Sequence, residues 1–190
     1  VIELWDNGLT GTLAALALNT GLLQVSLGGN QLSGTLAPIS ALSSLKYLML
    51  DRNHLSGPLD SLALNPHIVS LSLASNLLSG SLSVLADMPN LTTVVLTNNS
   101  LTGSVTVMEN RLTLEHLAVS SNRLFVTSPK TMTLNFPGAA FLALSQNGIA
   151  PGTVIEAIQL REPAILDLSG QEFSCPYPEV YFDILRLFVC

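Results

Sequence analysis

Charged residues are scarce in this sequence, and basic residues are the scarcer kind. Only 11% of the 190 residues are charged, and seven Lys and Arg against thirteen Asp and Glu leave a net charge of −6. The basic residues are scattered along the chain, whereas affinity for nucleic-acid phosphates requires clustered Lys and Arg. We therefore expect no nucleic-acid partner.

Long apolar runs are absent, although 48% of the residues are hydrophobic. No stretch reaches about 18 uncharged apolar residues, the length needed to span a bilayer, and no signal-peptide pattern is visible. The sequence opens inside a repeating pattern, in which Ile2, Leu4 and Leu9 would leave an apolar edge uncovered. We expect a membrane anchor or further repeats outside these residues.

Cysteine is limited to Cys175 and Cys190, both near the C-terminal end. Two cysteines confined to one terminal segment predict a single disulfide and an oxidising compartment. The alternative is two reduced thiols in a core. The disulfide interpretation places the protein in the secretory pathway, outside the cell or at its surface.

Motifs for catalysis and for metal binding are missing. The three histidines, His54, His67 and His116, are far apart in the sequence. No paired-histidine, paired-cysteine, nucleophile-elbow or phosphate-loop pattern occurs. We therefore expect no catalytic residue, no metal site and no cofactor.

A repeat of the form L-x-L-x-x-N-x-L-x-G-x-L fills most of the sequence, as in "LMLDRNHLSGPL". Its first six asparagines are 23 residues apart, and the next two steps are 25 and 24 residues, the last ending at Gln171. Such regular spacing is typical of a solenoid, in which each coil is stabilised by its neighbours. The frame asparagines are Asn7, Asn30, Asn53, Asn76, Asn99, Asn122 and Asn147.

The frame has a physical reading. In L-x-L the alternate residues point to opposite faces, so a short strand buries the leucines and exposes the residues between and beside them. The asparagine follows where the chain turns and where buried backbone groups need partners. The later glycine, such as Gly57, allows backbone angles that other residues resist.

These repeats resemble the leucine-rich repeat family over essentially the whole chain. The L-[ST]-G-x-[LVI] segment is similar to the plant-type subclass, although that subclass usually has 24 residues and an Ile-Pro that is missing here. In these departures the repeats are similar to surface antigens and proteophosphoglycans of trypanosomatid parasites. The resemblance implies an α/β repeat: a right-handed solenoid with a concave parallel β-sheet, an irregular or short-helical convex side and a ladder of hydrogen-bonded asparagines.

The repeats divide the chain into a solenoid of about eight coils, residues 1–172, and a C-terminal cap, residues 173–190, clamped by a Cys175–Cys190 disulfide. Two segments break the rhythm. Residues between Phe125 and Ala139 are expected to loop out. Val154, Ile155 and Ile158 are spaced as in a short amphipathic helix on the convex side.

Three positions in each coil are expected to face the concave surface. Exposed aromatic residues among small neutral ones are typical of a contact surface for a protein or glycan partner, although an inert wall would have the same pattern. The candidate binding residues are Glu3, Trp5, Gln24, Tyr47, Met49, Asp51, Thr93, Val95, His116 and Phe141.

Two glycosylation sequons begin at Asn90 and Asn98. Both are expected at loop or rim positions, where a glycan is sterically allowed.

The predicted function is non-catalytic recognition by an extracellular or cell-surface module. The alternatives are an inhibitor of secreted glycan-degrading enzymes and a structural element of a surface coat. A row of Ser and Thr beside the frame glycines is also compatible with ice binding, although these residues are ordinary for the plant-type repeat.

Overall fold

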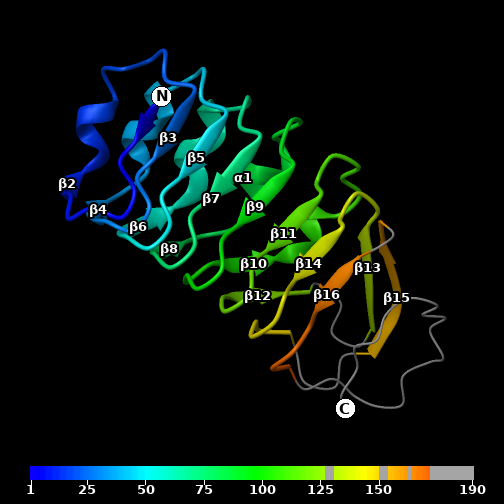
Figure 1. Cartoon of the computed structure of the whole chain (residues 1–190). Helices are drawn as coiled ribbons and strands as arrows, with labels where there is room; N and C mark the ends of the chain where they lie inside the picture. Colours follow the sequence, from blue (N-terminus) through cyan, green and yellow to red (C-terminus); the bar gives the residue numbers. More distant parts are fainter. Residues whose placement is uncertain (127–130, 150–153, 162–163, 172–190) are drawn as a thin grey trace.

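Short parallel strands recur once per coil in the computed structural model, which describes residues 1–126, 131–149, 154–161 and 164–171. Eight of them form one sheet, in which each strand is paired with that of the next coil along the chain (Figure 1). We call the outward side of this sheet the concave face. Its strands are β1 (Ile2–Glu3), β3 (Gln24–Ser26), β5 (Tyr47–Met49), β7 (Ser70–Ser72), β9 (Thr93–Val95), β11 (His116–Ala118), β14 (Phe141–Ala143) and β16 (Ile165–Asp167).

Alternation along each strand separates core from surface. In the third coil Leu48 and Leu50 are fully buried, whereas Tyr47, directly before Leu48, is 41% exposed. Tyr47 pairs with Gln24 on one side and Ser70 on the other. Equivalent residues of successive coils therefore form straight columns across the concave face.

A second set of strands follows the turn of each coil. β2 (Thr10–Thr12), β4 (Gln31–Gly34), β6 (His54–Pro58) and β8 (Leu77–Ser79) form a four-stranded sheet, and β10 (Thr102–Ser104) pairs with β12 (Arg123–Phe125). Of these strands, β2, β4, β6 and β10 contain the Ser-Gly or Thr-Gly step of the repeat.

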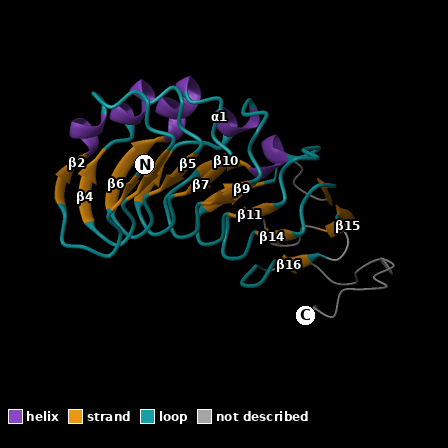
Figure 2. Cartoon of the chain, turned by 45° about the horizontal axis from the view of Figure 1, so that its top comes forward, coloured by secondary structure: helices purple, strands orange, loops and turns teal. Residues whose placement is uncertain are grey.

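Short helical turns return the chain on the convex side, opposite the large sheet (Figure 2). They are the 3-10 helices η1 (Leu13–Leu16), η2 (Ala37–Ala41), η3 (Leu59–Leu64) and η4 (Val105–Met108), and the single-turn helix α1 (Ser83–Ala86). Each supplies apolar side chains to the core, as Leu59 and Leu62 do from η3. Burial of one such leucine contributes roughly 1.5–3 kcal/mol.

The residue before each frame asparagine has left-handed backbone angles. The set is Asp6, Gly29, Arg52, Ser75, Asn98, Ser121 and Gln146, with φ between 51° and 67°. The sequence predicts a turn at only two positions of the frame, the asparagine and the later glycine. This third position is occupied by several residue types, so its conformation is imposed by the coil and not by residue preference.

The frame asparagines satisfy the backbone groups left open by this turn. Asn53 Nδ2 donates to the carbonyls of Leu50 (3.1 Å) and Asp51 (3.2 Å) in its own coil and to that of Leu27 (3.0 Å) in the preceding coil. Its Oδ1 accepts from the Leu32 amide at 2.9 Å. Asn76 repeats the pattern with Leu50 and Leu55.

Two polar side chains on the convex side have a similar role that the sequence did not reveal. The buried Asn65 donates to the carbonyls of Ile39 (3.0 Å) and Leu42 (2.8 Å) in the preceding coil. The guanidinium of Arg111 donates to the carbonyls of Leu85, Ala86 and Met88 at the end of α1. Both add a side-chain hydrogen bond from the following coil to carbonyls at the end of a short helix, and so tie neighbouring coils together on the convex side.

The expected helix around Val154, Ile155 and Ile158 is wrong. This segment is the strand β15 (Val154–Leu160), which pairs in parallel with β13 (Thr131–Phe136). The expected loop between Phe125 and Ala139 is therefore also wrong in part, because β13 lies within it. β-branched residues favour strands, and each of two adjacent long returns supplies the pairing partner of the other.

Residues 173–190, which include the expected cap with Cys175 and Cys190, lie outside the described residues. Within the described ranges, no helix is long and apolar enough to cross a membrane.

Replacement of Asn53 by Ala is expected to destabilise the fold by about 2–4 kcal/mol. The variant leaves the buried Leu32 amide without a partner, which costs about 1–3 kcal/mol, and it removes one of the hydrogen bonds that each of the Leu27, Leu50 and Asp51 carbonyls accepts. Asn7→Ala is the matched control, because Asn7 is exposed and bonds only to Leu4 and Trp5 of its own coil. Urea denaturation should show a loss below about 1 kcal/mol for the control. Equal losses would contradict the ladder interpretation.

Replacement of Gly57 by Ala is expected to cost about 1–2 kcal/mol. Gly57 has a φ of 83°, and an added Cβ would lie 3.3 Å from Thr35 Cγ2. Gly21→Ala is the control, because nothing lies within 4 Å of its Cβ position. In thermal melts, Gly57→Ala should have a lower melting temperature than Gly21→Ala. An unchanged melting temperature for Gly57→Ala would show that the turn tolerates a side chain.

Candidate binding surface

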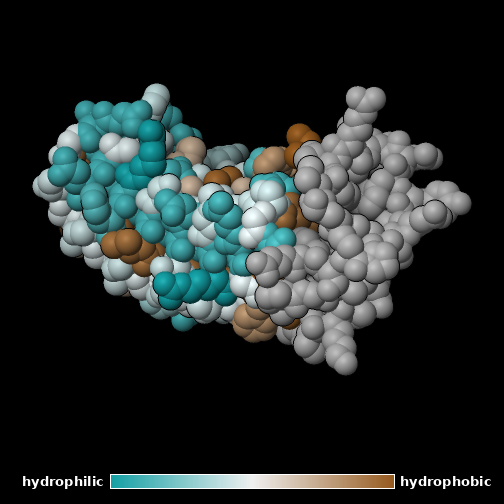
Figure 3. Space-filling view, turned by 90° about the horizontal axis from the view of Figure 1, so that it is seen from below, coloured by the Kyte–Doolittle hydropathy of each residue, from teal (hydrophilic) through white to brown (hydrophobic). Residues whose placement is uncertain are grey.

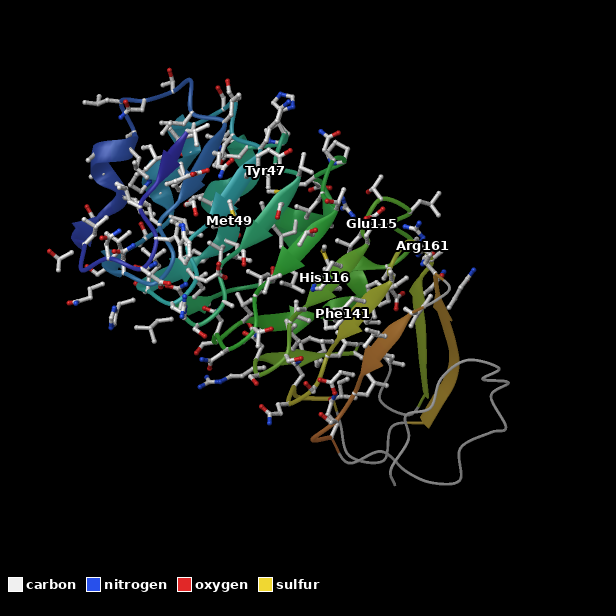
Figure 4. All side chains as sticks on the ribbon, viewed as in Figure 1. Tyr47, Met49, Glu115, His116, Phe141 and Arg161 are labelled. Atoms are coloured by element: carbon white, nitrogen blue, oxygen red, sulfur yellow. The ribbon has the colours of Figure 1, made fainter. Side chains whose placement is uncertain are left out.

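The ten candidate binding residues lie on the strands of the concave face or directly after them, and they fall into two groups. Figure 4 labels Tyr47 and Met49 on β5 and, in the C-terminal half of the sheet, His116 on β11 and Phe141 on β14. Thr93 and Val95 on β9 lie between the two groups and are half-buried.

The N-terminal group surrounds a hollow of about 400 Å³ in the concave face. Five predicted residues line it, and Ser26, Gly28 and Arg52 complete the lining although they were not predicted as site residues. The lining residues are Glu3, Trp5, Gln24, Ser26, Gly28, Met49, Asp51 and Arg52.

The floor of this hollow is open at Gly28, because glycine has no side chain to fill the space. The backbone of Asp6 donates to the Gly28 carbonyl at 2.8 Å, and Gly29 donates to the Asp51 carbonyl at 2.8 Å. Gly28 therefore lies between Trp5 in the preceding coil and Asp51 in the next. A side chain at this position would extend into the space between them, and its Cβ would lie 3.3 Å from the Asp51 carbonyl oxygen. The sequence signal was available, because the column reads Trp, Gly, Asp.

Asp51 is held in place by the following coil. Its Oδ1 accepts hydrogen bonds from Ser72 Oγ at 2.6 Å and from the Ala74 amide at 2.8 Å. Both donors are neutral, so the carboxylate is oriented without its charge being balanced.

The rim of the hollow contains two further polar pairs. Gln24 Nε2 donates to Glu3 Oε1 at 2.9 Å. Arg52 forms an ion pair with Asp6 at 2.9 Å, and both side chains are about half exposed or more. Such a pair contributes about 0–1 kcal/mol to stability. The positive charge of Arg52 at the rim is therefore already balanced by the Asp6 carboxylate.

The C-terminal group is centred on two stacked rings. The His116 and Phe141 rings have centroids 4.3 Å apart and an interplanar angle of 6°. Burial lowers the pKa of His116 from its ordinary value of 6.5. The ring is therefore kept neutral over a wider pH range than an exposed histidine.

Beyond this stack the concave face is more closed than expected. Ala118, Ser120, Ala143 and Ser145 occupy outward positions but are 6–8% exposed. The hydroxyls of Ser120 and Ser145 are hydrogen-bonded at 2.8 Å, and Ser145 Oγ donates to Asp167 Oδ2 at 2.7 Å. Small side chains thus lie deep in this half of the face, where they leave little contact area.

Asp167 is the carboxylate of this half. Burial alone would raise its pKa, but hydrogen bonds from Ser169 and Ser145 outweigh burial and lower it. Arg161 forms an ion pair with Glu115 at 3.1 Å. Figure 4 labels both side chains.

No cluster of three metal-ligating side chains is found among the described residues. His54, His67 and His116 lie at the start of β6, in the loop after η3 and on β11.

The two sequon asparagines are exposed. Asn98 Nδ2 donates to Ser75 Oγ at 3.3 Å, and Asn90 Nδ2 donates to the Pro66 carbonyl at 3.4 Å. Asn98 lies at the rim of the concave face, one residue after the column that contains Asp51.

No protein-family model matches the chain, and no curated protein matches it. Solved structures do. The leucine-rich repeat ectodomain of the Arabidopsis thaliana receptor kinase GASSHO1/SCHENGEN3 is 23% identical over 90% of this chain and 24% of its own, with a TM-score of 0.66. That of the Arabidopsis receptor kinase HAESA is 25% identical over 79% of this chain and 26% of its own, with a TM-score of 0.68. The chain has the leucine-rich repeat fold.

A plant ice-binding protein has the same fold, with 24% identity, a TM-score of 0.68 and coverage of 90% of this chain and 57% of its own. The chain spans about a quarter of the length of the two receptor ectodomains. The leucine-rich repeat architecture predicted from the sequence is thus confirmed in its sheet and in its short convex helices.

The His116 ring is expected to titrate below 6.5, and the Phe141→Ala variant should raise its pKa towards that value by exposing the ring. Because the folded pKa is lowered, the stability linked to neutral His116 is complete above pH 6.5 and is lost as the pH falls through the folded pKa. NMR titration of the ring resonances measures both values. A wild-type pKa at or above 6.5 would contradict the burial argument.

Proposed function

We propose that this protein is a non-catalytic recognition module that binds a protein or peptide partner on its concave face. The observation that supports this most directly is the hollow, where an exposed Trp5 and an oriented Asp51 flank a residue without a side chain. Exposed aromatic residues and pre-oriented polar groups on a rigid sheet are typical of protein contact sites.

The structural neighbours support a binding role. The GASSHO1/SCHENGEN3 ectodomain was solved in complex with CASPARIAN STRIP INTEGRITY FACTOR 2, and the HAESA ectodomain in complex with an IDA peptide hormone. By analogy, the present solenoid binds an extended segment along its columns. Seen from below, the described coils are mostly hydrophilic, with small separate hydrophobic patches (Figure 3), a surface suited to a reversible contact.

The proposed location is extracellular or at the cell surface. The two receptor-kinase neighbours are ectodomains, and the exposed Asn90 and Asn98 are proposed as glycosylation sites of a secreted protein. A Cys175–Cys190 disulfide and attachment to a membrane through residues outside this sequence belong to the same proposal. The 23-residue coil and the missing Ile-Pro support a relationship to trypanosomatid surface antigens.

The alternatives are less well supported. An inhibitor of secreted glycan-degrading enzymes would be expected to present many charges, whereas the concave positions contain only Glu3, Asp51 and Asp167 as carboxylates. A purely structural coat element would have no need of a lined hollow.

Ice binding is disfavoured by the hydroxyl row on the second set of strands. The hydroxyls of Ser33, Ser56 and Thr102 lie 3.3–3.4 Å from carbonyls of the preceding coil, to which they donate. These hydroxyls therefore serve the stacking of coils, and Pro58 interrupts the row.

A display library of coding fragments from the source organism tests the proposed function. Fragments selected on the wild-type protein should lose at least about tenfold in affinity with Trp5→Ala and Tyr47→Ala, since exposed aromatic anchors carry much of the binding free energy. These side chains are 61% and 41% exposed, so thermal stability should be unchanged.

Leu64→Ala is the matched control, because Leu64 is 65% exposed on the convex helix η3. It should bind as the wild type does. Selected partners that lose affinity with Leu64→Ala but not with Trp5→Ala would move the site to the convex side.

A further inference from the structure

We infer that the hollow around Gly28 binds a basic side chain of the partner, an arginine guanidinium in particular. This inference rests on the proposed function and specifies the chemistry of its N-terminal subsite. It comes from the balance of donors, acceptors and charge in the lining.

The hollow carries carboxylate charge that no cation in its lining neutralises. Glu3 accepts a hydrogen bond from the neutral amide of Gln24, and Asp51 accepts from the neutral Ser72 hydroxyl and the Ala74 amide. The lining's one cation, Arg52, is paired with Asp6 on the rim. A cationic ligand would therefore meet two carboxylates, whereas an anionic one would meet repulsion.

Hydrogen-bonding capacity points to the same ligand class. Gln24 and Arg52 each donate one hydrogen bond, to Glu3 and to Asp6, whereas each carboxylate of the lining has an oxygen that accepts none of these bonds. A guanidinium, which has five N–H donors and no acceptor, can donate to both of these oxygens.

Trp5 supplies an aromatic face for the ligand. Its side chain is 61% exposed, and the side-chain-free Gly28 separates it from Asp51. Two strand spacings of about 4.8 Å separate the Trp5 and Asp51 backbones, which leaves room for a planar group between the indole and the carboxylate. Guanidinium stacks on aromatic faces and pairs with carboxylates at the same time.

A random peptide library displayed on phage tests the inference. Peptides enriched on the wild-type protein should share an arginine at one position, and synthetic copies with citrulline in its place should bind at least about tenfold more weakly. Asp51→Asn and Glu3→Gln should each cause a similar loss. The Asn side chain can still accept the hydrogen bonds from Ser72 and Ala74 through Oδ1, so the substitution removes the charge and the free acceptor oxygen but keeps the orienting contacts.

Asp60→Asn is the charge-matched control, because Asp60 is exposed in the convex helix η3 and outside the hollow. It should bind as the wild type does. The chain's single tryptophan is Trp5, so its fluorescence should respond to the arginine peptide and not to the citrulline peptide. Melting temperatures of all variants verify that they are folded.

The outcomes separate this inference from the proposed function. Selected peptides without a shared basic residue, or with affinity unchanged by Asp51→Asn and Glu3→Gln, overturn the arginine subsite. If coding fragments are selected and depend on Trp5 while no arginine peptide binds, the concave face still binds partners and only the subsite is rejected. If nothing is selected from either library, both are rejected.

Discussion

Backbone groups buried at the turn of each coil are the constraint on which this structure depends. A left-handed residue reverses the chain and leaves carbonyls from two coils facing one side-chain position. An asparagine amide satisfies them and, through its Oδ1, holds an amide of the preceding coil. Because an unpaired buried group costs about 1–3 kcal/mol, the spacing between coils is fixed by this bond as much as by leucine packing. Asn65 and Arg111 do the same for carbonyls on the convex side.

The candidate binding surface is a consequence of that spacing. Residues that are 23 positions apart become neighbours in a column, so Trp5, Gly28 and Asp51 form one row although each comes from a different coil. The next coil then orients the side chain of the one before it, as Ser72 does for Asp51. Pre-orientation of this kind lowers the entropy lost on binding. A solenoid therefore builds a site with fixed geometry from residues that make no local motif.

Much of this arrangement could be predicted from the sequence, because one repeat unit dictates both core and surface. The columns follow from L-x-L and the 23-residue period alone. What could not be predicted depends on partners from other coils: β15 forms because β13 is present beside it, and Arg111 caps α1 only once the two coils are stacked. The burial of Ala118 and Ser145 likewise depends on how deep these positions lie in the curved sheet, which the repeat pattern alone does not give. Gly28 was visible in its column, but its meaning required the neighbours on both sides.

The scarcity of charge, from which we expect no nucleic-acid partner, also makes the few remaining charges important. In a surface of neutral hydroxyls and amides, a few carboxylates determine the local potential, because nearby cations that would screen them are few. The cations resolved in ion pairs lie at the rims, Arg52 with Asp6 and Arg161 with Glu115. Asp51 and Asp167 are instead oriented by serine hydroxyls within the face. Neutral donors orient these carboxylates without balancing their charge, which is the condition that the proposed arginine subsite requires of Asp51.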